Sequence, residues 1–204
     1  MSDAPAERPS PVPHADDHDF IGYADFGRRF FEAAVTQRRV EKAAAGLAGR
    51  PVEFGPRRVG PIGLVQVQAA GSVGRPAVER RDDPDHIAFA LTVPIDLQLT
   101  IEIGIDKNRF HADVLVRLEL TARAAAPLLI VIDIAEPTSR DVEVDLQADG
   151  VRASVLKLVA RIDGELRRTV AKLVRRELDH PSVRRARVID VGAAVESIEA
   201  SHRD

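Results

Sequence analysis

Residues 87–105 read IAFALTVPIDLQLTIEIGI, and this stretch decides the fold. Every odd position from Ile87 to Ile105 is apolar, whereas polar residues such as Asp96 and Glu102 occupy even positions. Successive side chains of a β-strand point to opposite faces, so this period of two predicts one strand with an apolar and a polar face. At about 3.3 Å per residue the strand would run about 60 Å, far beyond the usual length. So long a strand must bend to enclose a core.

A second alternating stretch follows. Residues 110–122, FHADVLVRLELTA, are apolar at every even position, and Asp106 to Arg109 predict a tight hairpin connection between the two stretches. The two stretches are therefore expected to pair as a long antiparallel ribbon. Shorter strands are predicted at residues 62–73, 77–81, 128–134, 142–146 and 185–191.

Two segments show helical periodicity instead. Between residues 21 and 47, apolar side chains recur at every third or fourth position, with a break near Thr36, which could cap a second helical segment. Residues 151–178 carry a longer apolar stripe, about 42 Å of helix at 1.5 Å per residue. The predicted fold class is therefore α+β: a long, strongly curved antiparallel sheet wrapped around an N-terminal and a long C-terminal helix.

The composition is that of a globular protein. The chain has 204 residues, of which 45% are hydrophobic and 30% charged, enough for one sizeable core. Residues 1–20 are acidic and proline-rich and are expected to form a disordered tail, residues 21–191 a single domain, and residues 192–204 a polar C-terminal tail. The absence of cysteine excludes a disulfide framework and a thiol nucleophile. With no leader pattern and no long apolar run, a cytoplasmic location is expected.

No enzyme motif is present. The sequence lacks a Gly-x-Ser-x-Gly elbow, a P-loop, a dinucleotide fingerprint and a His-Glu-x-x-His pair, so neither catalysis nor a cofactor is expected. His14 and His18 have the spacing of a helical metal site, but they lie in the tail, where no helix is predicted, so no metal site is expected. Four other polar residues are interpreted as solvated surface groups: His86, Asp96, Glu102 and His111.

The C-terminal helix has a basic end formed by Arg167, Arg168, Arg175 and Arg176. Two interpretations stay open. The arginines could meet the anionic headgroup of a lipid or an anionic membrane surface, or they could be the charged face that any amphipathic helix needs. Nucleic acid is not an expected partner, because almost no aromatic residues accompany the arginines for base stacking.

In the order of its elements, the chain resembles the tubular lipid-binding (TULIP) superfamily, which includes the bactericidal/permeability-increasing protein domains and the synaptotagmin-like mitochondrial lipid-binding domains. The resemblance rests on the helical segment 21–47, the two ladders, the strands LLIVIDI and VEVDL, and the helix VRASVLKLVARIDGELRRTVAKLVRREL. It implies a groove between helices and curved sheet that binds or transfers a lipid or another long hydrophobic ligand. The residues placed to line it are Phe26, Phe30, Leu97, Leu99, Ile101, Ile103, Val114, Val116, Leu118, Leu120, Ile130, Ile132, Val155, Val159, Ile162 and Leu166.

A closed core is the alternative to a ligand-filled groove. Protein interiors normally pack without large voids, so the same apolar residues could simply contact one another. The chain would then be a structural or interaction module, used as a homodimer or an adaptor. Few bulky aromatic residues serve so extended a sheet, which favours the groove.

Overall fold

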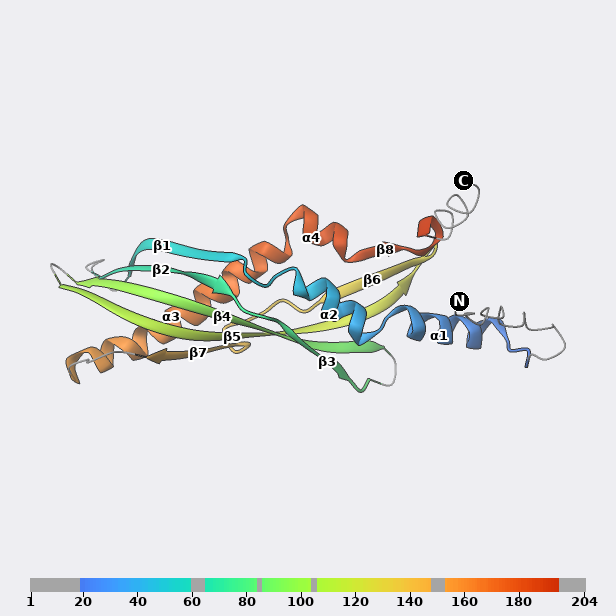
Figure 1. Cartoon of the computed structure of the whole chain (residues 1–204), viewed down its shortest axis with the longest axis horizontal. Coiled ribbons are helices and arrows are strands. Elements are labelled where there is room, and N and C mark those ends of the chain that lie inside the picture. The colour runs from blue at the N-terminus through green and yellow to red at the C-terminus, as the bar shows by residue number, and fades with distance from the viewer. Residues whose placement is uncertain (1–18, 60–64, 84–85, 104–105, 148–152, 195–204) are drawn as a thin grey trace, which may run out of the picture. The chain divides into compact units, whose positions relative to one another are not determined.

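A computed structural model of the chain describes residues 19–59, 65–83, 86–103, 106–147 and 153–194 (Figure 1). The chain forms two units, Met1–Ala34 and Val35–Asp204. The predicted tail, including His14 and His18, lies mostly outside the described residues. The same holds for most of the predicted C-terminal tail, residues 192–204.

The N-terminal helical segment is divided in two. Helix α1 spans Tyr23–Ala34 and belongs to the first unit, whereas α2 spans Gln37–Ala45 in the second. Thr36 takes the N-cap position of α2, which confirms the predicted break, but its side chain accepts no capping hydrogen bond. Helix α2 packs on β3, where the Gln37 amide nitrogen donates to the carbonyl of Val78 at 3.0 Å.

The second unit is built on a strongly curled, antiparallel half-barrel sheet, as predicted from the two ladders. Its strand order is β1-β2-β4-β5-β6-β8, with β3 paired to β4 beside β2 and β7 paired to β5 beside β6. The strands are β1 Pro51–Val59, β2 Val65–Val73, β3 Ala77–Arg81, β4 Ile87–Ile103, β5 Asp106–Ala125, β6 Leu129–Ile134, β7 Val142–Gln147 and β8 Val188–Asp190.

The long strands β4 and β5 pair in one uninterrupted register, from Ile103 opposite Asp106 to Ile87 opposite Ala122. The hairpin predicted at Asp106–Arg109 is therefore wrong, because all four residues belong to β5. Their polar side chains suggest a turn in the sequence, but in the structure all four residues pair with β4 near the end of a long strand.

Two further elements differ from the sequence prediction. Strand β1 was not predicted, because Gly55 and Pro56 interrupt its pattern; the structure accommodates them in a bulge between Phe54 and Arg57. In place of a strand over residues 185–191, helix α4 covers Pro181–Ala186 and only Val188–Asp190 is extended. The proline at the first helical position favours the helix start there.

The C-terminal helix α3 spans Ala153–Leu178 and confirms the predicted long helix within the described residues. Among the described strands, β7 is the one that α3 approaches most closely. In its C-terminal half the side chains of Leu166, Val170 and Ala171 are buried, as is the polar Thr169. Leu166 and Val170 belong to the predicted apolar stripe, whereas Thr169 and Ala171 do not.

Pro94 on β4 and Gly71 on β2 each occupy a special position in the sheet. On one side, β4 pairs with β3 as far as Thr92 and with β2 from Ile95 onward. Pro94 lies between these two paired segments, so its backbone nitrogen faces the gap between β3 and β2. Its missing N–H therefore costs no ladder hydrogen bond, while its carbonyl accepts from the Gly74 N–H. At Gly71 the backbones approach so closely that an added Cβ would lie 1.8 Å from the carbonyl oxygen of Asp96.

Candidate functional site

The inner face of the sheet is the face that carries the odd residues of β4 and the even residues of β5. Strand pairing extends it in rows across neighbouring strands: Val73, Ile95, Val114 and Val144 form one row, and Gly71, Leu97, Ala112 and Leu146 form the next. From Ile87 to Ile101 its β4 positions are all apolar and buried. Between Ile87 and Ile101 on β4 and between Phe110 and Ala122 on β5, the inner face is therefore one continuous uncharged surface.

One half of the inner face is sealed. Leu97, Leu99 and Ile101 are at most 2% exposed. On β5, Ala112, which pairs with Leu97, and Val114, which pairs with Ile95, are equally inaccessible. This half lies beside β7, which pairs with residues 111–116 of β5 and is the strand closest to α3.

The other half opens toward β6 and β8. Ile132 and Ile134 are on the inner face, because they pair with Ala122 and Leu120, and both are only half-buried. Ile189 pairs with the buried Ile130 and so belongs to the same face, yet 46% of it is exposed. We call Ile132, Ile134 and Ile189 the open end of the inner face.

The structure places most predicted lining residues on this face. Leu97, Leu99, Ile101, Val114, Val116, Leu118, Leu120, Ile130 and Leu166 are buried, and Ile132 belongs to the open end. Ile103 continues the inner phase of β4 by its pairing. Phe26 and Phe30 belong to α1 in the first unit, where both are exposed. The side chains of Val155, Val159 and Ile162 lie outside the described residues.

The sequence prediction missed Ile134 and Ile189. Ile134 continued the alternation of the predicted strand 128–134, so a signal for it existed. Ile189 carried no such signal, because its place on the inner face follows only from the pairing of β8 with β6.

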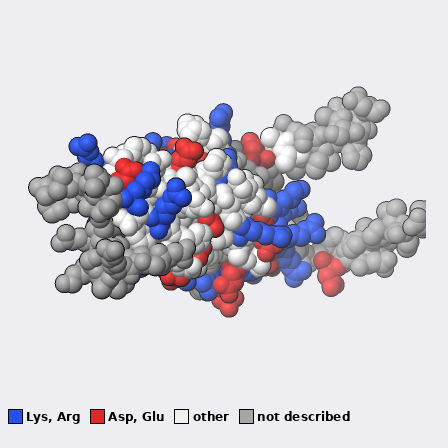
Figure 2. All heavy atoms as spheres, turned by 60° about the vertical axis from the view of Figure 1, so that its left-hand side comes forward, with Lys and Arg blue, Asp and Glu red and all other residues white. Residues whose placement is uncertain are grey.

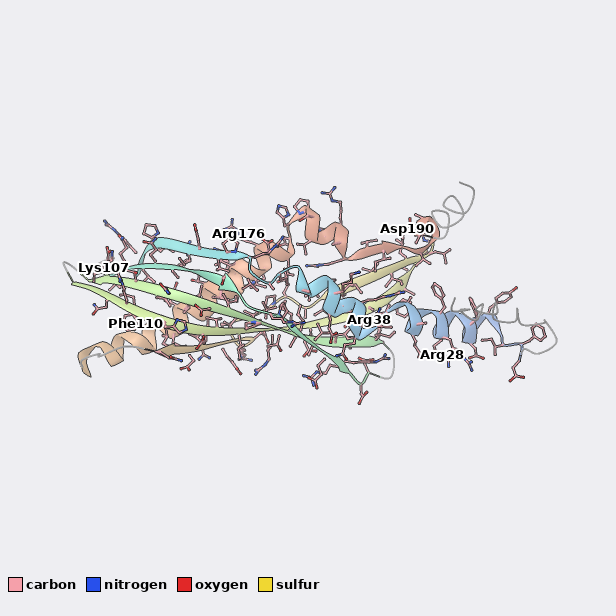
Figure 3. All side chains as sticks on the ribbon, viewed as in Figure 1. Arg28, Arg38, Lys107, Phe110, Arg176 and Asp190 are labelled. Carbon is pink, nitrogen blue, oxygen red and sulfur yellow. The ribbon has the colours of Figure 1, made fainter. Side chains whose placement is uncertain are left out.

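The four predicted headgroup arginines fall into two pairs. Arg167 and Arg168 already have carboxylate partners on α3, Asp163 and Glu165 respectively. Arg175 and Arg176, in the last turn of the helix, are exposed and have no ion-pair partner within the described part of the chain. Figure 3 labels Arg176 on this part of α3.

The outer face of the sheet is polar and of mixed charge. On the side of the molecule shown in Figure 2, basic and acidic side chains are interspersed with uncharged surface. Cross-strand ion pairs join Arg117 to Glu143 and Lys107 to Glu102. Lys107 is labelled in Figure 3 near the tip where β4 passes into β5. Among the described residues of this face, charges of both signs are interspersed, whereas a nucleic-acid surface typically gathers positive charge.

The same face gathers Asp96, His111 and Asp113, one ligand atom of each lying within 4.8 Å of the others. The sequence had given Asp96 and His111 as separate surface groups, because nothing in the alternation fixes which residues of the two strands face each other. By contrast, among the described residues His86 contacts one carboxylate, that of Asp83, at 3.4 Å.

None of the helices in the described part of the chain combines the length and apolar character that crossing a bilayer requires. Comparison with known protein families finds none that matches the chain, and comparison with curated proteins finds no similar sequence.

Proposed function

We propose that the chain binds a long hydrophobic ligand, such as a lipid acyl chain, between the inner face of the sheet and α3, without converting it chemically. This is the arrangement of the tubular lipid-binding superfamily that the sequence resembles. The observation that carries the proposal is the open end, where Ile132, Ile134 and Ile189 continue an otherwise buried, uncharged face to the solvent.

Element lengths support a groove that the helix does not fill. Strand β4 has 17 residues, about 56 Å at 3.3 Å per residue, and the 26 residues of α3 span about 39 Å at 1.5 Å per residue. Helix α3 lies closest to β7, which flanks the sealed half. The strand is therefore about 17 Å longer than the helix, and the open end lies in the half of the sheet away from β7.

Burial of the ligand's apolar surface supplies the driving force. Each methylene transferred from water to an apolar surface contributes about 0.8 kcal/mol. In the proposed arrangement, the unpaired Arg175 and Arg176 are the headgroup-binding residues, since Arg167 and Arg168 are already neutralised by Asp163 and Glu165. This assignment makes an anionic amphiphile the preferred ligand.

Lipid extraction of the purified full chain followed by mass spectrometry, together with titration with the fluorescent fatty acid cis-parinaric acid, tests the proposal. Ile189→Glu puts a carboxylate at the open end and should weaken binding at least about tenfold, because burying an unpaired charge is costly. Val188→Glu is the matched control: Val188 is 45% exposed, but it pairs with Val131 and so points to the outer face. Equal binding by the two variants, or no binding by the wild-type chain, contradicts the proposal.

Helix α1 favours a second function, that of an interaction module that self-associates. None of its residues is buried, and Tyr23, Phe26 and Phe30 are 98%, 59% and 43% exposed. The rings of Phe26 and Phe30 stack with centroids 6.3 Å apart on one side of the helix. Its polar positions hold two arginines and two acids, so no net charge draws the helix to an anionic membrane.

Light scattering of the full chain distinguishes this second function. A dimer that dissociates in the Phe26→Ser/Phe30→Ser variant, with the helix content unchanged by circular dichroism, supports self-association through α1. A wild-type monomer at all concentrations measured rules it out. The control is Arg28→Ser, on the polar side of the same helix.

A further inference from the structure

The outer face of the β4–β5 ladder holds a cluster of metal-ligating groups that is separate from the inner face. The Nε2 atom of His111 lies 3.3 Å from Oδ1 of Asp113 and 3.6 Å from Oδ2 of Asp96. All three side chains are partly solvent-accessible. The cluster therefore combines one imidazole and two carboxylates around a position that solvent ions can reach.

Strand register alone assembles the cluster. Asp96 is directly opposite Asp113 on β5, and Asp113 is directly opposite Asp145 on β7. Three carboxylates thus stand in one row across three adjacent strands. Like charges directly opposite each other destabilise a sheet, so this row is an electrostatic cost that a bound cation would remove.

A neighbouring side chain orients one of the ligands. The amide nitrogen of Gln147 donates to Oδ2 of Asp113 at 3.2 Å, which leaves Oδ1 facing His111. Gln147 is itself directly opposite His111 in the β5–β7 ladder. Outer hydrogen bonds of this kind hold the ligands of metal sites in position.

From this geometry we infer that Asp96, His111 and Asp113 bind a divalent transition-metal cation, with Zn²⁺ as the representative ion. Zinc bonds of about 2.0–2.1 Å in a tetrahedron place neighbouring ligand atoms about 3.3–3.4 Å apart. The two distances from His111 lie close to that spacing. An imidazole ligand favours zinc over Mg²⁺ or Ca²⁺, which take oxygen ligands.

The cluster leaves a coordination position open. A surface hollow adjoins it, with walls that include Gln98, Thr100, Arg109 and Gln147 as well as His111. A water molecule or a small anion in this hollow would complete the tetrahedron, and Arg109 would favour the anion. None of the three proposed metal ligands belongs to the inner face, so this inference does not depend on the proposed hydrophobic ligand.

Thermal unfolding of the EDTA-treated full chain, with and without ZnCl₂ or MgCl₂, tests the inference, and calorimetric titration gives the affinity. Zn²⁺ should raise the unfolding midpoint of the wild-type chain and Mg²⁺ should not, because a ligand that binds only the folded state stabilises it. His111→Ala and Asp96→Asn should each abolish the rise. Gln147→Ala should weaken Zn²⁺ binding about 10–100-fold.

His86→Ala is the control, because His86 lies outside the cluster and pairs with Asp83, so this variant should leave the response to Zn²⁺ unchanged. Both ligand variants replace accessible side chains and should fold, which circular dichroism should confirm. The absence of a Zn²⁺ response in the wild-type chain overturns the inference. An equal response in His111→Ala and Asp96→Asn also overturns it, since the ion would then bind elsewhere.

Discussion

Replacing Gly71 by alanine should destabilise the sheet far more than a single methyl group usually does. The new Cβ would lie 1.8 Å from the carbonyl oxygen of Asp96, whereas carbon and carbonyl oxygen meet at about 3.3 Å. Strands β2 and β4 would have to separate locally by about 1.5 Å, which stretches the ladder hydrogen bonds on both sides of Gly71. Overpacking costs about 1–3 kcal/mol and each broken hydrogen bond about 1 kcal/mol, so the expected loss is about 2–4 kcal/mol.

Gly164→Ala is the matched control, because it is the same substitution in the middle of α3, where an added Cβ meets nothing within 4 Å. It should stabilise the chain by about 0.5–1 kcal/mol through helix propensity. Urea unfolding and thermal melting measure both variants. For a chain of this size, Gly71→Ala should lower the melting temperature by about 5–15 °C and Gly164→Ala should raise it by a few degrees. A Gly71→Ala variant that melts within about 1 °C of the wild type would refute the reasoning.

Three further predictions concern single side chains. Hydrogen bonds from the backbone and the hydroxyl of Thr138 hold the pKa of Asp141 below its ordinary value. The stabilisation that the Asp141 carboxylate provides should therefore be present above about pH 4 and be lost as the pH falls through the lowered pKa. Asp141→Asn should flatten this loss in acid unfolding curves. Leu99→Ala, in the sealed half of the inner face, should cost about 2–5 kcal/mol in urea unfolding. Arg117→Ala breaks an exposed pair with Glu143 and should cost at most about 1 kcal/mol, a difference that should shrink in 1 M NaCl.

The alternation of apolar residues predicts faces well and register poorly. A pairing shifted by two residues keeps every side chain on its face, so the pattern alone allows several registers. The hairpin predicted at Asp106–Arg109 would place Ile105 opposite Phe110. In that register, Asp96 would lie opposite Glu119. The structure pairs Asp96 with Asp113 instead. The Asp96–His111–Asp113 cluster could not be derived from the sequence for this reason, although the inner face could.

Elements with a clear periodicity were predictable whatever their length, since the five residues of β3 were predicted as well as the long helix α3, whereas elements without a periodicity were not. The periodicity of α3 runs through most of its 26 residues, so a few irregular positions do not hide it. Strand β8 has three residues and gains its place only by pairing with β6, as Ile189 does with Ile130. The place of Ile189 in the open end depends on that pairing, so no local pattern revealed it, whereas Ile132 and Ile134 follow the alternation of the predicted strand 128–134.

The bulged strand β1 also limits what the molecule can assemble into. A sheet grows from its outermost strands, and an unpaired, regular edge invites another chain to add to it. Strand β1, at one end of the sheet order, interrupts its edge with Pro51, Pro56 and the bulge and carries Arg57 and Arg58 beside them. Strand β8, at the other end, has only three residues to offer. Within the described residues, both ends of this strand order therefore discourage the fibre-like addition of further copies of the chain.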